Sequence, residues 1–142
     1  MRIADVLRTK GSAVATITAE TSVSGLLNEL SLHNIGAMVV VSTDGVVGIV
    51  SERDVVRKLH ERGGELLRMP VSEIMTTMVA TCTPTDTVDH LSALMTNKRV
   101  RHVPVMDNDR LVGIVSIGDI VKQRMEELER EQRALQDYIT RG

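Results

Sequence analysis

The feature that most constrains the fold of this chain is an internal repeat with a fixed offset of 65 residues. At that offset, residues 14–58 align with residues 79–123 without a gap, and 15 of the 45 pairs are identical. The identities concentrate in "VAT", in a helix-like stretch, and above all in "VGIVS" with the aspartate that follows. Two copies this short cannot each bury an adequate core, so the 142-residue chain is expected to fold as one unit or as an oligomer.

Each copy predicts the order β-α-β-β-α, preceded by a short helical lead-in. Apolar residues recur at helical spacing after a polar start, and two short β-branched runs separated by turn residues follow them. The helix positions expected to be buried are Val23, Leu26, Leu27 and Leu30 in the first copy and Val88, Leu91, Leu94 and Met95 in the second. The predicted class is α/β, with two repeats packed about an approximate twofold axis and ligand clefts at the seam between them.

The expected boundaries are residues 1–62 for the first repeat, 63–70 for a linker, 71–125 for the second repeat and 126–142 for a C-terminal helical tail. In the second repeat, Pro104 lacks an amide donor, which predicts a strand at a sheet edge or facing a ligand.

The tail has the pattern of an amphipathic helix. Positions 121, 125, 128, 132, 135 and 139 carry Val, Met, Leu, Gln, Leu and Ile, with charged residues between them. Such a helix either folds back on its own subunit or crosses to a partner. We favour a partner subunit, because the chain is small and has many apolar faces.

Charge and composition narrow the classes of partner. The formal net charge is −2 and Tyr138 is the only aromatic residue, so no nucleic-acid partner is expected. No apolar run reaches the ~20 residues of a membrane helix, and the N-terminal sequence does not resemble a signal peptide, which predicts a cytoplasmic protein without a membrane partner. Cys82 is the only cysteine, so no disulfide framework is possible and a core position is expected.

The two Ser-x-x-Asp sequences, "SERD" and "SIGD", admit two interpretations. A serine at a helix start with an acidic residue three positions later is a capping box, which needs no ligand. The same geometry presents amide groups and a carboxylate to an anion or a ribose diol. Because a cap can be Ser, Thr, Asn or Asp, the use of Ser-x-x-Asp at both sites favours a ligand role, and both interpretations can hold together.

The doubled unit with "GIVSERD" and "GIVSIGD", together with "SEIMT" and "KRVRHVPV", resembles a pair of cystathionine β-synthase (CBS) domains, often called a Bateman module. The resemblance covers about residues 1–125 and is closest to small stand-alone CBS-pair proteins. It implies a regulatory module that binds an adenosine-containing ligand, with AMP as the first candidate and ADP, ATP, NAD or S-adenosylmethionine as alternatives. It also implies a homodimeric sensor with an effector protein still to be identified, no catalysis and no catalytic cofactor.

Carried over residue by residue, the resemblance implies that Asp54 and Asp119 hold ribose hydroxyls, with Ser51 and Ser116 near the phosphate or ribose. The residues that it places at the adenine edge or around the base are Thr16, Thr18, Thr81, Thr83, Ala37, Met38, His102, Val103 and Pro104. A cleft in this family draws on both repeats, and which threonine serves which aspartate stays open.

A phosphate group would require positive charge. The candidates are Lys10, Arg53, Arg99 and Arg101. A guanidinium can pair with two phosphate oxygens at once, so the arginines rank above the lysine. Arg53 has Gly118 as its counterpart, which predicts unequal clefts. The Asp119 cleft is expected to borrow charge from Arg99 and Arg101 or to go without it.

No other chemistry stands out. The four histidines lack the spacing of a metal site, and neither a phosphate-binding GxxxxGK[ST] loop nor a GxSxG nucleophile is present. The sequence therefore predicts neither a metal site nor an enzyme. Two alternatives to a ligand sensor stay open, namely a constitutive interaction protein that uses the scaffold and tail without a ligand, and an enzyme that acts on nucleotides.

Overall fold

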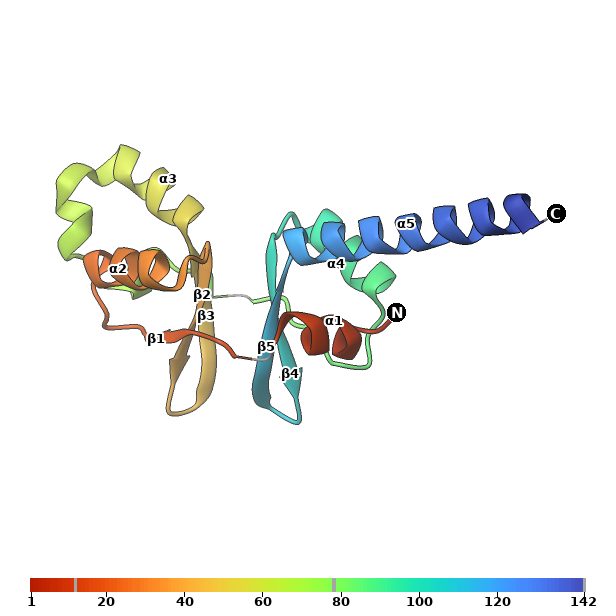
Figure 1. The fold of residues 1–142 in the computed structure, drawn as a ribbon. Coiled ribbons are helices and arrows are strands. Elements are labelled where there is room, and N and C mark those ends of the chain that lie inside the picture. Colours follow the sequence, from red (N-terminus) through yellow and green to blue (C-terminus); the bar gives the residue numbers. More distant parts are fainter. Residues whose placement is uncertain (12, 78, 142) are drawn as a thin grey trace.

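Helices and strands follow one another in nearly the same order in the two halves of the chain (Figure 1). The computed structural model describes residues 1–11, 13–77 and 79–141. The first half contains α1 (Ile3–Lys10), β1 (Thr16–Thr18), α2 (Val23–His33), β2 (Ala37–Ser42), β3 (Gly45–Ser51) and α3 (Glu52–Arg62). Two 3-10 helices follow, η1 (Gly63–Arg68) and η2 (Val71–Glu73). The second half contains α4 (Val88–Lys98), β4 (His102–Asp107), β5 (Arg110–Ser116) and α5 (Ile117–Arg141). The predicted α/β class with a C-terminal helix is confirmed.

Two small sheets lie side by side at the centre of the molecule, with the helices on their outer sides (Figure 1). In the first sheet β1 runs parallel to β2, and β2 pairs antiparallel with β3. In the second, β4 pairs antiparallel with β5. Both hairpins shift register at equivalent points, between Val40 and Val41 in β2 and between Val105 and Met106 in β4. The repeat therefore extends to the irregularities of the strands.

The second half lacks a counterpart of β1 among the described residues. Only Cys82 of the run "VATCT" pairs with β4, through a single parallel bridge, so the prediction of a strand there is wrong. Pro104 stands where β2 has a valine opposite β1, and a proline has no amide to donate. In addition, the Thr83 amide donates to the Asp86 carboxylate over 2.8 Å. In the part of the chain that the structure describes, β4 has only β5 as a full neighbour, which confirms the predicted edge position.

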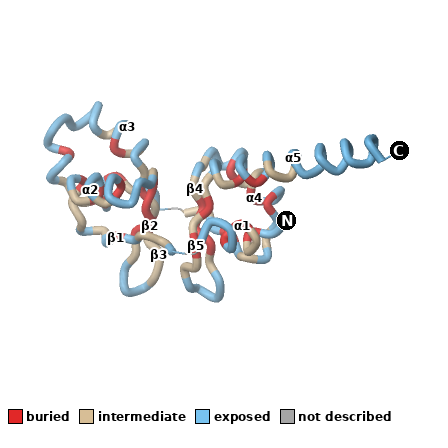
Figure 2. The backbone as a smooth tube through the Cα atoms, in the orientation of Figure 1, coloured by how far each residue is buried: buried red, intermediate tan, exposed pale blue. Residues whose placement is uncertain are grey.

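Each half has its own hydrophobic core, but the lead-in segments are exchanged between the halves. Three residues of α1 join the core of the second half, namely Ile3, Val6 and Leu7. Val71 and Ile74, which precede the second copy, join the core of the first half. Figure 2 shows the buried residues in these two groups. Cutting the chain in the linker would therefore remove part of each core.

The predicted buried helix face is largely confirmed. The buried members are Val23, Leu26 and Leu30 in α2 and Val88, Leu91 and Met95 in α4. Leu27 is exposed, so its prediction is wrong, and Leu94 is partly buried. In the linker, Leu66 of η1 is fully buried in the first core. Cys82 is buried, as expected, and burial raises the pKa of its thiol to about 12, with the nearby charge of Asp86 acting in the same direction.

The second helix of the second copy and the predicted tail form one continuous helix, α5, of 25 residues. Its C-terminal part extends away from both sheets rather than folding back on them (Figure 1). The predicted stripe positions Val121, Met125, Leu128, Leu135 and Ile139 are all exposed. The last residue of the predicted tail, Gly142, lies outside the described residues. The predicted amphipathic stripe is therefore present, and it has no cover from its own chain within the described residues.

Candidate functional site

Both Ser-x-x-Asp sequences lie where a strand passes directly into a helix, β3 into α3 and β5 into α5. The Ser51 amide donates to Asp54 Oδ2 over 2.8 Å, and the Asp54 amide donates to Ser51 Oγ over 3.3 Å. The equivalent distances for Ser116 and Asp119 are 2.8 and 3.2 Å. Each pair thus forms the reciprocal hydrogen bonds of a capping box, as the capping interpretation predicts.

The capping box uses one oxygen of each carboxylate. Among the described residues, Oδ2 of Asp54 and of Asp119 receives all the hydrogen bonds made to these side chains, and none reaches Oδ1. Both side chains are half-buried and each lines a cavity. An oxygen able to accept a hydrogen bond from a ligand hydroxyl therefore stays available beside each helix N-terminus, so capping and ligand binding are compatible.

A cavity of about 620 Å³ opens at Asp119, and we call it the Asp119 cleft. The second half contributes β5 and the first turn of α5, and the first half contributes the segments that precede β1 and β2. The aliphatic residues that line it are Ala13, Val14, Ala15, Ile35, Ala37 and Ile114. These side chains can hold a flat ring by dispersion contacts, and the one aromatic residue of the chain, Tyr138, is not among those that line the cleft.

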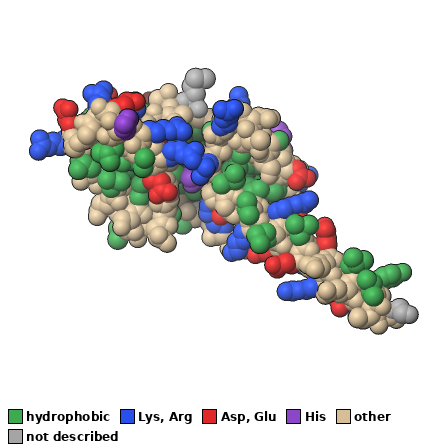
Figure 3. All heavy atoms as spheres, turned by 90° about the horizontal axis from the view of Figure 1, so that it is seen from above, with side chains coloured by type: hydrophobic (Ala, Val, Ile, Leu, Met, Phe, Trp, Pro, Cys, Tyr) green, Lys and Arg blue, Asp and Glu red, His purple; other side chains and the backbone are tan. Residues whose placement is uncertain are grey.

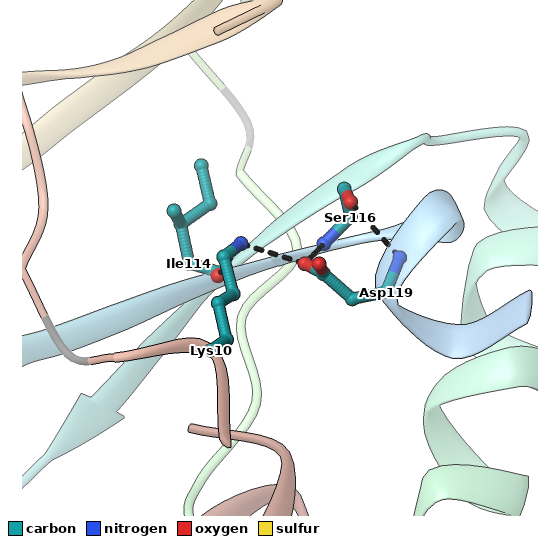
Figure 4. A network of polar contacts seen from close by, with 4 residues as sticks. All are labelled: Lys10, Ile114, Ser116 and Asp119. Carbon is teal, nitrogen blue, oxygen red and sulfur yellow. Dashed lines mark hydrogen bonds and ion pairs between the residues drawn. The ribbon is translucent and has the colours of Figure 1, made fainter. Parts of the chain in front are cut away.

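Lys10, the last residue of α1, reaches into the Asp119 cleft (Figure 4). Its Nζ donates to Asp119 Oδ2 and to the carbonyl oxygen of Ile114, each over 2.6 Å. Burial acts to raise the pKa of Asp119, but the hydrogen bonds from Lys10 and Ser116 and the charge of Lys10 outweigh it. The pKa therefore lies below its ordinary value. Asp119 is ionised at neutral pH and carries its counter-ion within the same chain.

A second cavity, of about 140 Å³, opens at Asp54, and we call it the Asp54 cleft. Its walls are β3 and the start of α3 from the first half and the segments around residues 76–80 and 99–102 from the second. Four arginines are among the residues that line it, namely Arg53, Arg57, Arg99 and Arg101. No ion pair within the described part of the chain involves any of these four arginines. The Asp54 cleft is therefore positively charged, whereas Lys10 neutralises the charge of Asp119 in the other cleft.

Ala37 and His102 line both clefts, and they occupy equivalent positions in the two copies. The clefts thus meet at the approximate twofold axis. Equivalent backbone hydrogen bonds lie there as well: the Glu52 amide donates to the Gly36 carbonyl over 3.0 Å, and the Ile117 amide donates to the Arg101 carbonyl over 2.8 Å. Burial is the main cause that lowers the pKa of His102, and the charge of Lys10 lowers it further. His102 is therefore a neutral hydrogen-bonding group at pH 7, positioned between the clefts.

Several predicted residues do not reach either cleft. Met38 and Val103 are fully buried in the two cores. The others that lie outside both linings are Pro104, Thr16, Thr18, Thr81 and Thr83. The chain passes the clefts just before Thr16 and Thr81, at positions 14–15 and 79–80. A ligand role for these seven residues stays a prediction.

The structure brings the other predicted residues together in a different combination from the expected one. Ser116, Asp119 and Lys10 share the Asp119 cleft, and Ser51, Asp54 and Arg53 share the Asp54 cleft. Arg99 and Arg101, which were expected to serve Asp119, line the Asp54 cleft instead, because the segment before β4 faces the first half.

Arg57 and Thr76 of the Asp54 cleft are among the lining residues that sequence reasoning missed. Arg57 follows Arg53 by four residues on the same helix, and this spacing places both side chains on one face, which is a signal that could have identified it. Thr76 is held at the Asp54 cleft because its backbone pairs with that of Ile49. The local sequence does not predict this pairing.

Among the helices that the structure describes, none combines the length and the apolarity needed to cross a membrane. In the same described ranges, no group of three or more His, Cys, Asp or Glu side chains is arranged to hold a metal ion.

Comparison with known proteins identifies relatives along nearly the whole chain. The family model described as "CBS domain" matches residues 3–61 and 71–126. A mitochondrial CBS domain-containing protein of Arabidopsis thaliana is 34% identical over 149 aligned positions, which cover 99% of this chain and 72% of the relative.

Solved structures agree with these matches. A CBS-domain-containing protein from Agrobacterium tumefaciens is 43% identical with a TM-score of 0.84, covering 87% of this chain and 99% of that one. The CBS domain pair of protein MJ0100, crystallised with 5'-methylthioadenosine and S-adenosyl-L-methionine, is 27% identical with a TM-score of 0.80. That alignment covers 89% of this chain and 98% of the other.

Proposed function

Because the chain belongs to the CBS-domain family, we propose that it is a regulatory module that binds an adenosine-containing ligand in the Asp119 cleft. The observation that carries the proposal is the free Oδ1 of Asp119, at a helix N-terminus, beside a cavity of about 620 Å³. This volume falls within the range of roughly 300–1,000 Å³ that small-molecule sites occupy. A carboxylate there can accept hydrogen bonds from a ribose diol, while the aliphatic walls hold the base. The adenosine compounds in the MJ0100 complex support this ligand class.

AMP is the ligand that we propose first. Lys10 is the only Lys or Arg among the described residues that line the Asp119 cleft, and it is already paired with Asp119. The cleft therefore suits a ligand with no more than one phosphate, such as AMP, or an adenosine compound without phosphate. ATP, ADP, NAD and S-adenosylmethionine complete the panel to be compared.

Isothermal titration calorimetry with AMP tests the proposal, using Asp119→Asn against Asp54→Asn. The substitution at Asp119 removes the charge that grips the ribose, and loss of one such charged hydrogen bond is expected to weaken AMP binding about tenfold or more. Asp54→Asn removes the equivalent cap in the other cleft and should leave the affinity for AMP unchanged. If Asp119→Asn lowers only the melting temperature and not the affinity, the carboxylate is a helix cap alone and the proposal fails.

We further propose that the module works as a homodimer. The exposed stripe on α5 supports this, since Leu128 and Leu135 are 50% and 61% exposed although they lie on the apolar face of an amphipathic helix. A second copy would cover such a face. Light scattering on the double variant Leu128→Glu and Leu135→Glu is expected to give a monomer where the unmodified chain gives a dimer. A double variant on the polar face, Glu126→Gln with Arg133→Gln, serves as the control and should stay dimeric.

We also propose that ligand binding changes the shape of the seam between the two halves and so changes the affinity for an effector protein. In this proposal the protein catalyses no reaction and acts in the cytoplasm. The location of both clefts between the two halves supports a coupling of this kind, because a ligand there contacts both. Incubation of nucleotides with the protein should give no product by chromatography, and a product would overturn the regulatory assignment. Cell fractionation tests the compartment, since the Arabidopsis thaliana relative is named as mitochondrial.

A further inference from the structure

The end of α5 beyond the matched CBS domain carries an apolar helix face without a cover among the described residues. The family match stops at residue 126, whereas α5 continues to Arg141. Figure 3 shows hydrophobic side chains along this protruding end of the molecule. In this segment Leu135 and Ile139 are 61% and 67% exposed. A single helix in water is marginally stable unless its apolar face packs against another element, so this end of α5 is expected to pack on a partner.

The spacing of the stripe identifies the kind of partner. From Val121 to Ile139 the stripe positions follow one another by alternate steps of four and three residues. An average step of 3.5 residues is the repeat of a left-handed coiled coil, in which two positions per heptad, named a and d, face another helix. The a positions are 125, 132 and 139, and the d positions are 121, 128 and 135. On the far side, the b, c and f positions from 126 to 141 are charged or polar apart from Ala134. The apolar face is therefore narrow and fits one helix.

Gln132 is the one polar residue among these a and d positions. In a parallel pair of identical helices each a position faces its own copy, so the two Gln132 side chains would meet and could hydrogen-bond to each other. In an antiparallel pair an a position faces a d position, and Gln132 would lie against a leucine with its amide unsatisfied, which costs free energy. A single polar residue at an a position is a known determinant of register and of the number of strands. Gln132 therefore favours a parallel pair of two copies.

The charges beside the stripe favour the same arrangement. Arg124 occupies a g position and Glu129 the e position that follows it by five residues. In a parallel pair these two positions lie side by side across the contact, so Arg124 would meet Glu129 of the partner subunit, twice by symmetry. Within the chain Arg124 pairs only with Glu127, over 3.2 Å at the surface, and Glu129 forms no ion pair in the described ranges. In an antiparallel pair g faces g and e faces e, and this match of charges is lost.

We propose that residues 124–139 of α5 form a parallel, two-stranded coiled coil with the same segment of a second copy of this chain. The inference rests on the proposed homodimer, to which it adds the orientation and the contacting residues. The two modules would lie at the same end of the coiled coil. Because Asp119 is in the first turn of the same helix, α5 would run without interruption from the Asp119 cleft into the dimer contact.

Oxidative cross-linking of the full chain with one added cysteine tests the orientation. We expect Gln132→Cys, at an a position, and Leu135→Cys, at a d position, each to shift from the monomer band to a disulfide-linked dimer band on a non-reducing gel. Ala134→Cys, on the far face, is the matched control and should give no more dimer than the unmodified chain. The native Cys82 is buried, and its raised pKa of about 12 keeps it a thiol near neutral pH, so it should add little background.

A charge exchange tests the flanking pair. Arg124→Glu brings like charges together at both e and g contacts of a parallel pair, and we expect it to raise the dissociation constant of the dimer about tenfold at low salt. Adding Glu129→Arg restores opposite charges and should return the constant close to that of the unmodified chain. Arg130→Glu, at an f position, is the control and should leave the constant unchanged. Sedimentation equilibrium measures all four constants.

The outcomes separate this inference from the homodimer itself. If light scattering gives a monomer for the unmodified chain, both fail. If the chain is a dimer but neither Gln132→Cys nor Leu135→Cys cross-links, the parallel coiled coil is wrong and the homodimer stands. Cross-linking only in a mixture of these two variants would show an antiparallel pair and would overturn the inference. A weakening by Arg124→Glu that Glu129→Arg does not reverse would overturn it as well, because the two side chains would then not meet across the dimer.

Discussion

In the two halves of the molecule, the lead-in segments bind to strands β3 and β5 through different hydrogen bonds. In the first half, Thr76 pairs with Ile49 of β3 through the main chain, with N to O distances of 2.9 and 3.0 Å. In the second half, the Ile114 carbonyl of β5, the counterpart of Ile49, accepts instead from the side chain of Lys10 over 2.6 Å. One strand is thus joined to its lead-in by neutral amides, and the other by a charged amine.

This difference explains why two similar aspartates lie in unlike surroundings. The amine that satisfies the Ile114 carbonyl also reaches Asp119, so the lead-in helix α1 and the carboxylate are linked. The amide of Thr76 has no charge to offer Asp54, and the arginines around that cleft come from other segments. The two clefts thus differ in charge at the junction of lead-in and strand and also in the arginines that other segments contribute.

The largest expected effect concerns the packing of the lead-ins on the glycines of β3 and β5. A Cβ on Gly48 would lie 2.9 Å from the backbone oxygen of Thr76, whereas one on Gly113 would meet only the flexible side chain of Leu7, at 2.6 Å. We expect Gly48→Ala to lower the free energy of unfolding by about 3 kcal/mol and Gly113→Ala by about 1 kcal/mol, the range typical of overpacked sites.

Urea denaturation measures both values. Gly64→Ala is the control, because its Cβ would meet nothing within 4 Å, and it should leave stability unchanged or slightly raised. Equal losses for Gly48→Ala and Gly113→Ala would contradict the distinction between a rigid main-chain junction and a flexible side-chain one.

A smaller effect is expected from Lys10→Met, which removes the counter-ion of Asp119. The side chains of this pair are only 32% and 22% exposed, so we expect the variant to lose about 1 kcal/mol at pH 7. Lys10 helps to hold the pKa of Asp119 below its ordinary value. Its contribution is therefore fully present above the unfolded pKa of about 3.9 and disappears as the pH falls through the lowered pKa of the folded state.

Melting temperatures of the unmodified chain and of Lys10→Met, measured from pH 7 down to pH 3, test this expectation. The gap between them should stay constant above about pH 5 and narrow below about pH 4, as Asp119 becomes protonated. Lys98→Met, at the end of α4, should show no gap at any pH. A gap for Lys10→Met that does not depend on pH would indicate lost packing of the lysine stem rather than a lost ion pair.

Much of the fold could be predicted because its signals are local. Helical spacing located α2 and α4, and turn residues separated the paired strands, in both copies. The exchange of lead-ins could not be predicted, since the apolar residues of α1 suit either core and only the path of the chain decides between them. The absence of a β1 counterpart in the second half could have been predicted from Pro104. Its missing amide interrupts the hydrogen bonds of a parallel strand pair, as well as marking a sheet edge.

The candidate site was predictable to the same extent. Ser51, Asp54, Ser116 and Asp119 were found because the repeat singles them out, and their capping hydrogen bonds follow from spacing. The assignment of cations to clefts was not predictable, because it depends on which segments face each other across the seam. That geometry brings Arg99 to the cleft of Asp54, although the two are 45 positions apart in the chain. It also brings Lys10 to Asp119, which is more than 100 positions away.

The smallest expected effect is on His102, which shares a wall with both clefts and so reports on the charge of each. Burial is the main cause of its lowered pKa, followed by the charge of Lys10, with Asp119 acting in the opposite direction. In an NMR titration we expect Lys10→Met to raise the pKa of His102 and Asp119→Asn to lower it, while Lys98→Met leaves it unchanged. Because burial persists in all three variants, each pKa should stay below the ordinary value of about 6.5. If neither Lys10→Met nor Asp119→Asn changes the pKa of His102, then the charges of the Asp119 cleft do not act on this side chain. The two clefts would then lack this electrostatic link.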